Sequence, residues 1–270
     1  MEFKLSKEQE LIQKTAREYA EKSIKPIIFQ IDEQNHIPEE ILTGMAELEL
    51  FGIPHPTEYG GAGADYVSYA LAVEQIARYS SAVAGIIGTN NMGVSAIRNF
   101  GTEDQKKKWM PGCFTGRQSA SFAFTEPGTG SDPKMLTTTA KRDGDYYIIN
   151  GTKRFTTNAG FRGPMITFAA DEEAGFPSAF IIDKFCSGYS LSEPWEKIGQ
   201  RGGHTYDVYL KDIRIPVENL LGERGKAFPM LIQNVAFGKI GLCAMALGRA
   251  QGALEESIKY AKEKTKRGKP

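Results

Sequence analysis

SASFAFTEPGTGSD, residues 119–132, is the stretch of this chain that says most about its fold. Apolar and small residues alternate in its first half, which predicts a β-strand. The strand then breaks at Pro127, whose ring fixes φ and whose nitrogen carries no proton. Gly128 and Gly130 permit positive φ and let a ligand approach the backbone closely. The stretch therefore predicts a strand that ends in a stiff, open turn.

Two interpretations of this turn are open from its residues alone. Pro, Gly, Ser and Asp dominate ordinary tight turns between strands, so the turn needs no function. Alternatively, the hydroxyls of Thr125 and Ser131 and the successive backbone N–H groups form a nest for anionic oxygens. Such a nest would suit a cofactor that carries phosphate. The rest of the chain decides between the two interpretations.

The composition is that of an ordinary folded protein without a charge bias. The chain has 270 residues, of which 41% are hydrophobic and 24% charged, enough for one or two domains with a sizeable core. Lys and Arg total 33, as do Asp and Glu, so the net charge is zero. No general field gathers nucleic acid or membrane lipid. We therefore expect neither as a partner, and no stretch is expected to approach the length of a membrane span.

The thiols and imidazoles give no sign of a metal site. The cysteines lie far apart with no CxxC spacing, which predicts reduced, mostly buried thiols and a cytoplasmic protein. They are Cys113, Cys186 and Cys243. The histidines show no metal-ligand spacing either, and each is expected in a turn or on the surface: His36, His55 and His204.

Residues 1–117 predict an α-helical domain. Ser6 and Gln9 form a capping box ahead of apolar residues at helical spacing. Further helices are expected at 38–50, 66–79 and 82–100, and Thr102 is expected to cap a short polar helix.

Residues 118–225 predict an antiparallel β domain, either a barrel or a sandwich. Turn residues separate short runs rich in β-branched and aromatic side chains, at 146–150, 165–170, 178–182 and 207–216. Asn150-Gly151, between YYII and TKRFTT, predicts a hairpin, and a break is expected near Lys211-Asp212. No helix is predicted between these strands.

Helical spacing returns in residues 226–270, which predict the beginning of a C-terminal helical domain. An apolar stripe steps by three and four along it: Ile240, Cys243, Leu247, Ala250, Leu254 and Ile258. A single helix cannot bury such a stripe. We expect either that further helices are lacking or that the stripe packs on another subunit.

The order of helices, β domain and helices, with TEPGTGSD on the β domain, resembles the acyl-CoA dehydrogenase family. The resemblance covers essentially the whole chain, because five stretches resemble family signatures in the family's order: GTEDQKKKWMPG (101–112), FAFTEPGTGSD (122–132), YYIINGTKRFTTNAG (146–160), GQRGGHTYDVYLKDIRIPVENLLG (199–222) and ALGRAQGALEESIKYAKEKTKRGKP (246–270). It points to short-chain, butyryl-CoA dehydrogenase-like members with the C-terminal part lacking. It implies an α+β multidomain fold with domains at 1–117, 118–225 and 226–270.

The resemblance also implies a function. The family's members are FAD-dependent oxidoreductases of fatty acid metabolism that remove the α- and β-hydrogens of an acyl-CoA and pass the electrons to an electron-transfer flavoprotein. A homo-oligomer, expected to be a tetramer, is implied as well, and the 270 residues alone are expected to be inactive. One alternative is an enoyl-CoA reductase or a cyclic or aryl acyl-CoA dehydrogenase on the same scaffold. Another is a non-catalytic partner or scaffold.

The resemblance places FAD in a crevice between the β domain and the helices. The implied cofactor-binding residues within one subunit are Phe122, Phe124, Thr125, Gly130, Ser131, Phe155, Thr156 and Thr157. Phe155 supplies an aromatic edge, and Thr157 supplies a donor near the reducible nitrogen of the flavin, which stabilises the reduced ring. The residues alone favour an ordinary inward and outward pair on a strand. Lys264 stands where the family has an Arg that reaches FAD across a subunit interface, and Arg267 where it has Phe.

For the acyl-CoA, the resemblance implies contacts from Ser131, Met92, Ser95 and Lys239. Lys239 stands where short-chain members carry Arg, so a point charge replaces a planar fork. The stretch that includes Arg201 and Thr205 is implied to support the domain interface.

The catalytic base is not identified among these residues. Most family members carry the Glu beyond the position of Pro270, and a minority carry it where this chain has Gly238. The carboxylates at hand are expected to be poor substitutes because they belong to the turn or to a solvent-facing helix side: Glu126, Asp132, Glu255 and Glu256.

Overall fold

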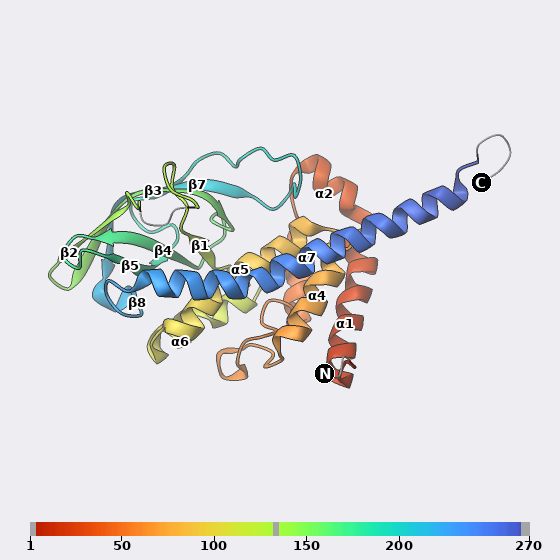
Figure 1. Ribbon diagram of the computed structural model, residues 1–270, viewed down its shortest axis with the longest axis horizontal. Helices are drawn as coiled ribbons and strands as arrows, with labels where there is room; N and C mark the ends of the chain where they lie inside the picture. The colour runs from red at the N-terminus through yellow and green to blue at the C-terminus, as the bar shows by residue number, and fades with distance from the viewer. Residues whose placement is uncertain (1–3, 132–134, 266–270) are drawn as a thin grey trace.

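The computed structural model describes residues 4–131 and 135–265, in which helices precede and follow a β-sheet (Figure 1). The helices are α1 (Lys7–Tyr19), α2 (Ile28–Gln34), α3 (Glu39–Glu47), α4 (Tyr66–Ala77), α5 (Ser81–Phe100), α6 (Glu103–Trp109) and α7 (Ala227–Glu263). The strands are β1 (Ser121–Ala123), β2 (Thr139–Asp143), β3 (Tyr146–Thr157), β4 (Pro164–Asp171), β5 (Pro177–Asp183), β6 (Tyr189–Leu191), β7 (Thr205–Pro216) and β8 (Leu220–Leu221). The predicted α+β fold class is confirmed.

The N-terminal helices begin where side chains can cap them. The Ser6 side chain accepts a hydrogen bond from the N–H of Gln9, whose side chain accepts one from the N–H of Ser6. Thr102 caps α6 through an equivalent box. Both predicted caps are confirmed. The helix predicted at 38–50 ends earlier, at Glu47, because Glu49 adopts a left-handed φ of 57°.

The sheet runs in the order β6-β7-β3-β2-β4-β5-β8, with β1 beside β4. Most pairings are antiparallel, as predicted, but β4 runs parallel to both β1 and β2. β1 pairs with residues 165–167 of β4 and β2 with residues 170–171, so the two strands follow one another along the same edge of β4. The chain leaves the sheet between them, and the TEPGTGSD turn lies in that excursion.

The hairpin predicted at Asn150-Gly151 is wrong. β3 runs unbroken past these residues against β7, and the hairpin turn falls at Gly144-Asp145, between β2 and β3. Asn150 instead lies opposite a β-bulge in β7, at Lys211-Asp212 where a break was expected, and its side chain exchanges hydrogen bonds with the backbone N–H and the carboxylate of Asp212. The dipeptide that favours a tight turn is therefore accommodated within a strand, where the irregularity falls in the partner strand.

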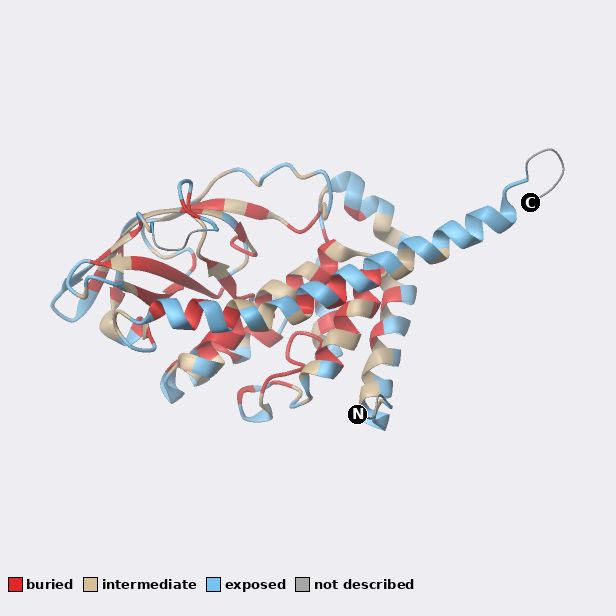
Figure 2. Ribbon diagram, in the orientation of Figure 1, coloured by how far each residue is buried: buried red, intermediate tan, exposed pale blue. Residues whose placement is uncertain are grey.

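The buried residues form two hydrophobic clusters (Figure 2). The larger joins the helices to β4 and β5, and it includes Ile97 of α5 and Phe168 of β4. The smaller lies within the sheet, around Tyr147, Phe180 and Val208. Because helices and sheet share the larger core, they form one packed unit.

The expectation of mostly buried thiols is wrong, whereas His55 lies in a turn, as expected, but in one that is buried. Of the three thiols, only Cys113 is buried, whereas Cys186 is half-buried and Cys243 exposed. His55 is not at the surface but fully buried, where it stacks on Phe114 with ring centroids 5.3 Å apart. The Gly- and Pro-rich residues around His55 suggested an exposed turn, but this turn packs into the helical core.

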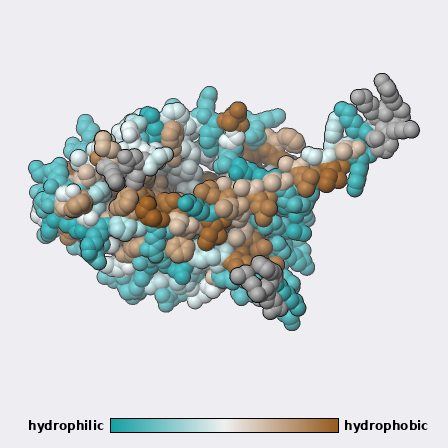
Figure 3. Space-filling model, in the orientation of Figure 1, coloured by the Kyte–Doolittle hydropathy of each residue, from teal (hydrophilic) through white to brown (hydrophobic). Residues whose placement is uncertain are grey.

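The face of α7 that packs on the chain differs from the predicted stripe. Gly241, Ala244 and Gly248 are buried, and a Cβ at Gly248 would lie 2.1 Å from the carbonyl oxygen of Glu74 on α4. The small residues let the two helices approach closely. The larger apolar residues point outwards, with Leu247 57% and Leu254 54% exposed. Figure 3 shows hydrophobic side chains gathered along this helix.

By length and composition alone, α7 is apolar enough to cross a membrane, with an 18-residue window of mean hydropathy 1.5 of which 33% is buried. The prediction that no stretch approaches that length was therefore wrong. Part of the window packs on α4 and α5, where a core helix also collects apolar residues.

Candidate functional site

The TEPGTGSD turn and the end of β3 lie side by side. The carbonyl oxygen of Thr125 accepts a hydrogen bond of 2.7 Å from the N–H of Arg154. The two stretches that were expected to share one site are therefore brought together by the strand pairing of β1 and β4 and by this contact.

Glu126 lies in the turn, as expected, but its side chain points into the protein. Its side chain is fully buried and its Oε1 lies 2.7 Å from the Nζ of Lys153, which is also fully buried. The carboxylate accepts further hydrogen bonds from the N–H and hydroxyl of Thr137 (2.6 and 2.7 Å) and from the N–H of Thr138 (3.1 Å). Burial alone would raise the pKa of Glu126, but Lys153 and these donors hold the pKa at about 2.

At the tip of the turn, the described residues leave space beside Gly128 and Gly130. Glu126 and Thr129 exchange backbone hydrogen bonds of 2.8 and 3.1 Å across it. Among residues 4–131 and 135–265, no atom lies within 4 Å of a Cβ placed at Gly128, and only the Cγ2 of Thr125, at 3.9 Å, lies near one placed at Gly130. Neither glycine adopts positive φ, so the reason given for them from sequence is wrong, whereas the room for a ligand is present. Ser131 is exposed, and Asp132 lies outside the described residues.

The end of β3 carries a second bulge, between Lys153 and Thr156. Phe155 has φ 57°, a conformation that is rare for a bulky residue. Its ring is 53% exposed and lies 5.1 Å from that of Trp195. Thr156 is buried with its Oγ1 unpartnered among the described residues, so a cofactor contact from it would use its backbone. The Oγ1 of Thr157 lies 3.1 Å from that of Thr205.

A cavity of about 220 Å³ adjoins Thr157 and lies between α5 and α7. Its lining brings together two residues that were predicted for one site, Thr157 and Met92. The other lining residues are Ala84, Gly85, Gly88, Thr89, Gln200, Gly238, Gly241, Leu242 and Met245. None of these carries a carboxylate. The glycines were not predicted from sequence, where nothing distinguishes them from glycines that only allow close helix packing.

Several predicted residues lie elsewhere. Ser95 is buried beside the hydroxyl of Tyr66, 3.3 Å away, and does not line this cavity. Lys239 lines a separate apolar groove between α4 and α7. Lys264 lies at the far end of α7 from the sheet, where its Nζ donates to the hydroxyl of Tyr260 (Figure 1). Within one chain it cannot join the site, and Arg267 lies outside the described residues.

Phe122 and Phe124 are half-buried beneath the turn. Their rings lie 5.2 and 5.9 Å from that of Phe168, which is buried in the sheet. Both rings therefore pack on the larger hydrophobic cluster, and only part of each side chain is exposed.

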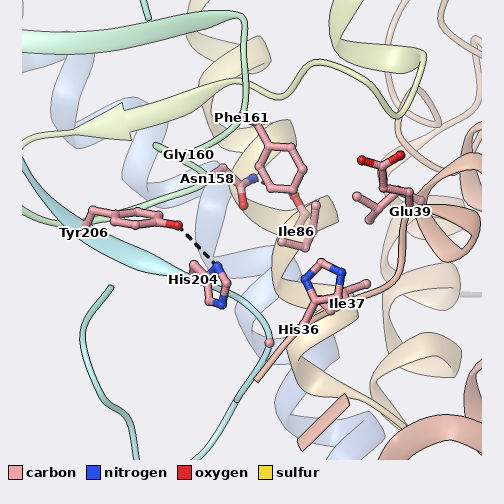
Figure 4. Close-up of a pocket in the computed structure, with 11 residues that line it drawn as sticks. His36, Ile37, Glu39, Ile86, Asn158, Gly160, Phe161, His204 and Tyr206 are labelled. Atoms are coloured by element: carbon pink, nitrogen blue, oxygen red, sulfur yellow. Dashed lines mark hydrogen bonds between the residues drawn. The ribbon is translucent and has the colours of Figure 1, made fainter. Parts of the chain in front are cut away.

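A second cavity, of about 160 Å³, lies behind the end of β3 (Figure 4). Asn158 and Tyr206 from the sheet face His36 and Glu39 from the helical part across it. The Nε2 of His204 donates to the carbonyl oxygen of Asn35 (2.6 Å), so its Nδ1 accepts from the Tyr206 hydroxyl (3.3 Å). These bonds join sheet and helices.

Arg201 acts at the same junction as this second cavity, as its stretch was expected to do. Its Nε donates to the carbonyl oxygen of Asp32 at 2.8 Å.

Within residues 4–131 and 135–265, no three His, Cys, Asp or Glu side chains gather in a way that could hold a metal ion.

Comparisons with known proteins identify relatives of this chain. Residues 6–117 match the profile of the "Acyl-CoA dehydrogenase, N-terminal domain" and residues 121–213 that of the "Acyl-CoA dehydrogenase, middle domain". A short-chain specific acyl-CoA dehydrogenase of Clostridium acetobutylicum is 38% identical over 273 residues, which cover 100% of this chain and 72% of that protein. A 3-(aryl)acrylate reductase of Clostridium sporogenes is 39% identical over 98% of this chain and 71% of its own length.

Solved structures give the same result. Butyryl-CoA dehydrogenase from Megasphaera elsdenii superposes with a TM-score of 0.95 at 33% identity, over 100% of this chain and 73% of that one. An acyl-CoA dehydrogenase from Bacillus anthracis complexed with FAD superposes with a TM-score of 0.92 at 33% identity, over 98% and 46%. A chain in a structure of the electron transferring flavoprotein of Acidaminococcus fermentans reaches 0.95 at 34% identity, over 100% and 72%.

Proposed function

The chain belongs to the acyl-CoA dehydrogenase family, and we infer on that premise that it is an FAD-dependent enzyme of acyl-CoA metabolism. It introduces a double bond between the α- and β-carbons of an acyl-CoA, and its electrons pass to an electron-transfer flavoprotein. The observation that carries this inference is the meeting of the TEPGTGSD turn, the Thr157 end of β3 and the cavity between α5 and α7.

The residues at this meeting point fit FAD. The open space before Gly128 and Gly130, with the exposed hydroxyl of Ser131, suits a pyrophosphate. The exposed ring of Phe155 offers an apolar edge to a flat ring system. When bound, the flavin accepts the hydride that leaves the β-carbon of the substrate.

We propose that the side chain of Thr157 points towards the flavin ring. Its hydroxyl lies within hydrogen-bond distance of the Thr205 hydroxyl and borders the cavity. If the Thr205 hydroxyl donates to the Thr157 Oγ1, the Thr157 proton is free to point into the cavity. Thr205 thereby fixes the orientation in which Thr157 donates.

The cavity supports a second candidate, the same scaffold acting on branched or aryl acyl groups. Its volume of about 220 Å³ exceeds the roughly 150 Å³ of an engineered apolar cavity that binds benzene. Glycines keep it open at three places where a Cβ would meet no atom closer than 3.4 Å: Gly85, Gly88 and Gly238. Reduction of an enoyl-CoA would use the same residues, because flavin and base serve both directions.

The catalytic base stays a prediction. Glu126 cannot serve, because Lys153 and three donors from Thr137 and Thr138 occupy its carboxylate oxygens and hold its pKa at about 2, which makes it a weak base, and because it does not line the cavity. Gly238 lines the cavity but carries no side chain. We therefore propose, from the family resemblance, that a Glu beyond Pro270 removes the α-proton.

Three finer properties are also proposals. A homotetramer would cover the exposed apolar residues of α7, among them Leu247 and Leu254, and would bring Lys264 to a neighbouring subunit's FAD. The unpaired thiols suit a cytoplasmic protein. The N-terminal profile, which ends at residue 117, suits the first domain limit, the start of α7 at Ala227 suits a second limit near 225, and the enzyme's relatives suit a place in fatty acid metabolism.

The test of the function is spectroscopic. The purified protein should be yellow, and its flavin absorption should bleach when a saturated acyl-CoA is added. A panel of straight, branched and aryl CoA thioesters then separates the two candidates. A protein that stays colourless and takes up no added FAD refutes the enzyme. A protein that binds FAD but reacts with no thioester in either direction supports a non-catalytic partner or scaffold.

A further inference from the structure

The bulge at the end of β3 is a conformation that the local sequence does not favour. Phe155 and Asn158 both adopt left-handed φ, 57° and 62°. Such residues persist only where the surrounding structure forces the conformation, and they cluster at functional sites. The bulge turns Phe155 outwards, buries Thr156 and aims Thr157 at the cavity. The contacts that force it are therefore of functional interest.

The start of the bulge is tied to the TEPGTGSD turn by a buried charge pair. Lys153 Nζ bonds Glu126 Oε1 at 2.7 Å and also donates to the carbonyl oxygen of Phe168 on β4. One residue further along each segment, Arg154 N–H donates to Thr125. The turn and the strand thus share a two-residue contact whose centre is fully buried.

A second buried amine holds the chain just after the bulge, at Asn158, which follows the last residue of β3. Lys184 Nζ donates to the carbonyl oxygens of Asn158 (2.9 Å) and Ser119 (2.7 Å) and to the hydroxyl of Ser121 (3.1 Å). Residues 154–157 therefore lie between two residues that buried hydrogen bonds hold in place, Lys153 and Asn158. Neither of these two residues lines the cavity.

We propose that Glu126 and Lys153 are positioning residues for FAD, whose ion pair holds the turn and the bulge at the separation that the flavin nucleotide requires. Neither side chain reaches the cavity, so they act through Thr125, Phe155 and Thr157. The proposal rests on the proposed function for the identity of the ligand. It adds two residues for which composition and family motif gave no role in binding.

A simple stabilising role for the pair predicts a different outcome from a positioning role. Removing one partner of a buried pair leaves an uncompensated charge, whereas replacing both by uncharged groups is often neutral for stability. The double variant Glu126→Gln/Lys153→Met should therefore fold like the wild type. It lacks the charged link between turn and strand and keeps only the backbone bond from Arg154 to Thr125, so a positioning role predicts weak FAD binding in this well-folded variant.

The experiment measures the dissociation constant of FAD and the reduction potential of the bound flavin. Wild-type protein is stripped of flavin and titrated with FAD beside Glu126→Gln, Lys153→Met and the double variant. We expect the dissociation constant to rise at least tenfold in all three variants. The reduction potential should become more negative, because a displaced Thr157 no longer donates to the reduced ring. If either single variant does not fold, the result for the double variant decides the test.

Asp171→Asn is the matched control. Asp171 is another fully buried carboxylate of the same sheet, paired with Arg224 at 2.7 Å, but it lies away from the turn and does not line the cavity. Its dissociation constant for FAD should stay within twofold of the wild type. A double variant with wild-type affinity and potential overturns the positioning role and leaves the proposed function intact. A wild-type protein that binds no FAD overturns the proposed function instead.

Discussion

The glycines of α5 and α7 fall into two kinds, and alanine should affect the stability of the protein in opposite directions at the two. A Cβ at Gly248 would lie 2.1 Å from the carbonyl oxygen of Glu74 and 3.0 Å from the Cβ of Ala77. A Cβ at Gly88 would have the hydroxyl of Tyr69 as its nearest neighbour, 3.9 Å away. The first glycine allows two helices to touch, and the second leaves space.

The magnitudes follow from two opposing contributions. In a helix interior, Ala is more favourable than Gly by about 1 kcal/mol. Nothing opposes this gain at Gly88, so Gly88→Ala should raise the free energy of unfolding by about 1 kcal/mol. At Gly248 the added methyl overlaps a backbone atom that no side-chain rotation can move. Overpacking costs about 1–3 kcal/mol. With the cost at its upper end, Gly248→Ala should lower the free energy of unfolding by about 2 kcal/mol.

Urea unfolding followed by circular dichroism measures both differences on one scale. Thermal melting should agree, with shifts of about 2 °C upwards for Gly88→Ala and about 4 °C downwards for Gly248→Ala. A Gly248→Ala protein as stable as the wild type would show that α4 and α7 do not approach as closely as the structure has them. A destabilised Gly88→Ala protein would show that the space beside Gly88 is filled.

Three further predictions address the cavity and the response to acid. Gly88→Leu should fill part of the cavity and weaken binding of an aryl-CoA by at least tenfold while butyryl-CoA is bound normally, as measured by flavin bleaching; equal losses for both would refute a role in acyl size. Burial lowers the pKa of His55 to about 3. Its unfolded value is near 6.5, so the unfolded chain binds the proton first and stability should fall as pH drops from about 6.5 to 3. His55→Phe should flatten that slope in urea titrations, whereas a control at the exposed His36 should leave it unchanged. Asp171→Asn removes a buried partner of Arg224 and should cost about 2–4 kcal/mol in the same assay. Burial would raise the pKa of Asp171, but Arg224, Ser178 and the N–H of Ala174 lower it overall, so its contribution is present above about pH 4 and lost as pH falls below that value.

Features decided by a few neighbouring residues could be predicted from the sequence. The boxes at Ser6 and Thr102 need only a hydroxyl and a Gln three residues later, and both form. Asn150-Gly151 failed because its partner decides the outcome, and that partner, Asp212, is 62 residues away. The periodicity of α7 identified a helix but not its packed face. Large apolar residues suggested the stripe, whereas the small residues around Gly248 set the contact with α4.

The residues of the candidate site also include some that could be predicted from the sequence and some that could not. Thr157 and Met92 were placed together by resemblance, and the structure brings both to one cavity. Ser95 and Lys239 were placed there too but lie elsewhere, because a residue's position along a helix does not fix the neighbour that its face meets. Glycines that leave space could not be recognised, since Gly88 and Gly248 look alike until the neighbouring helix is known.

Lys153 shows how much of the contact between the two positioning residues could have been predicted from the sequence. In β3 the inward positions alternate, with Tyr147, Ile149 and then Lys153 buried. A lysine at an inward position requires a carboxylate or several oxygens around it. The TEPGTGSD turn offers two acids, Glu126 and Asp132, so the alternation in β3 could have predicted that one of them pairs with Lys153. The same parity would then have sent Phe155 inwards and Thr156 outwards. The structure has the reverse, because the bulge after Lys153 inserts one residue into the alternation. The contact that anchors the site was therefore within reach of sequence reasoning, whereas the face that the site presents required the three-dimensional register.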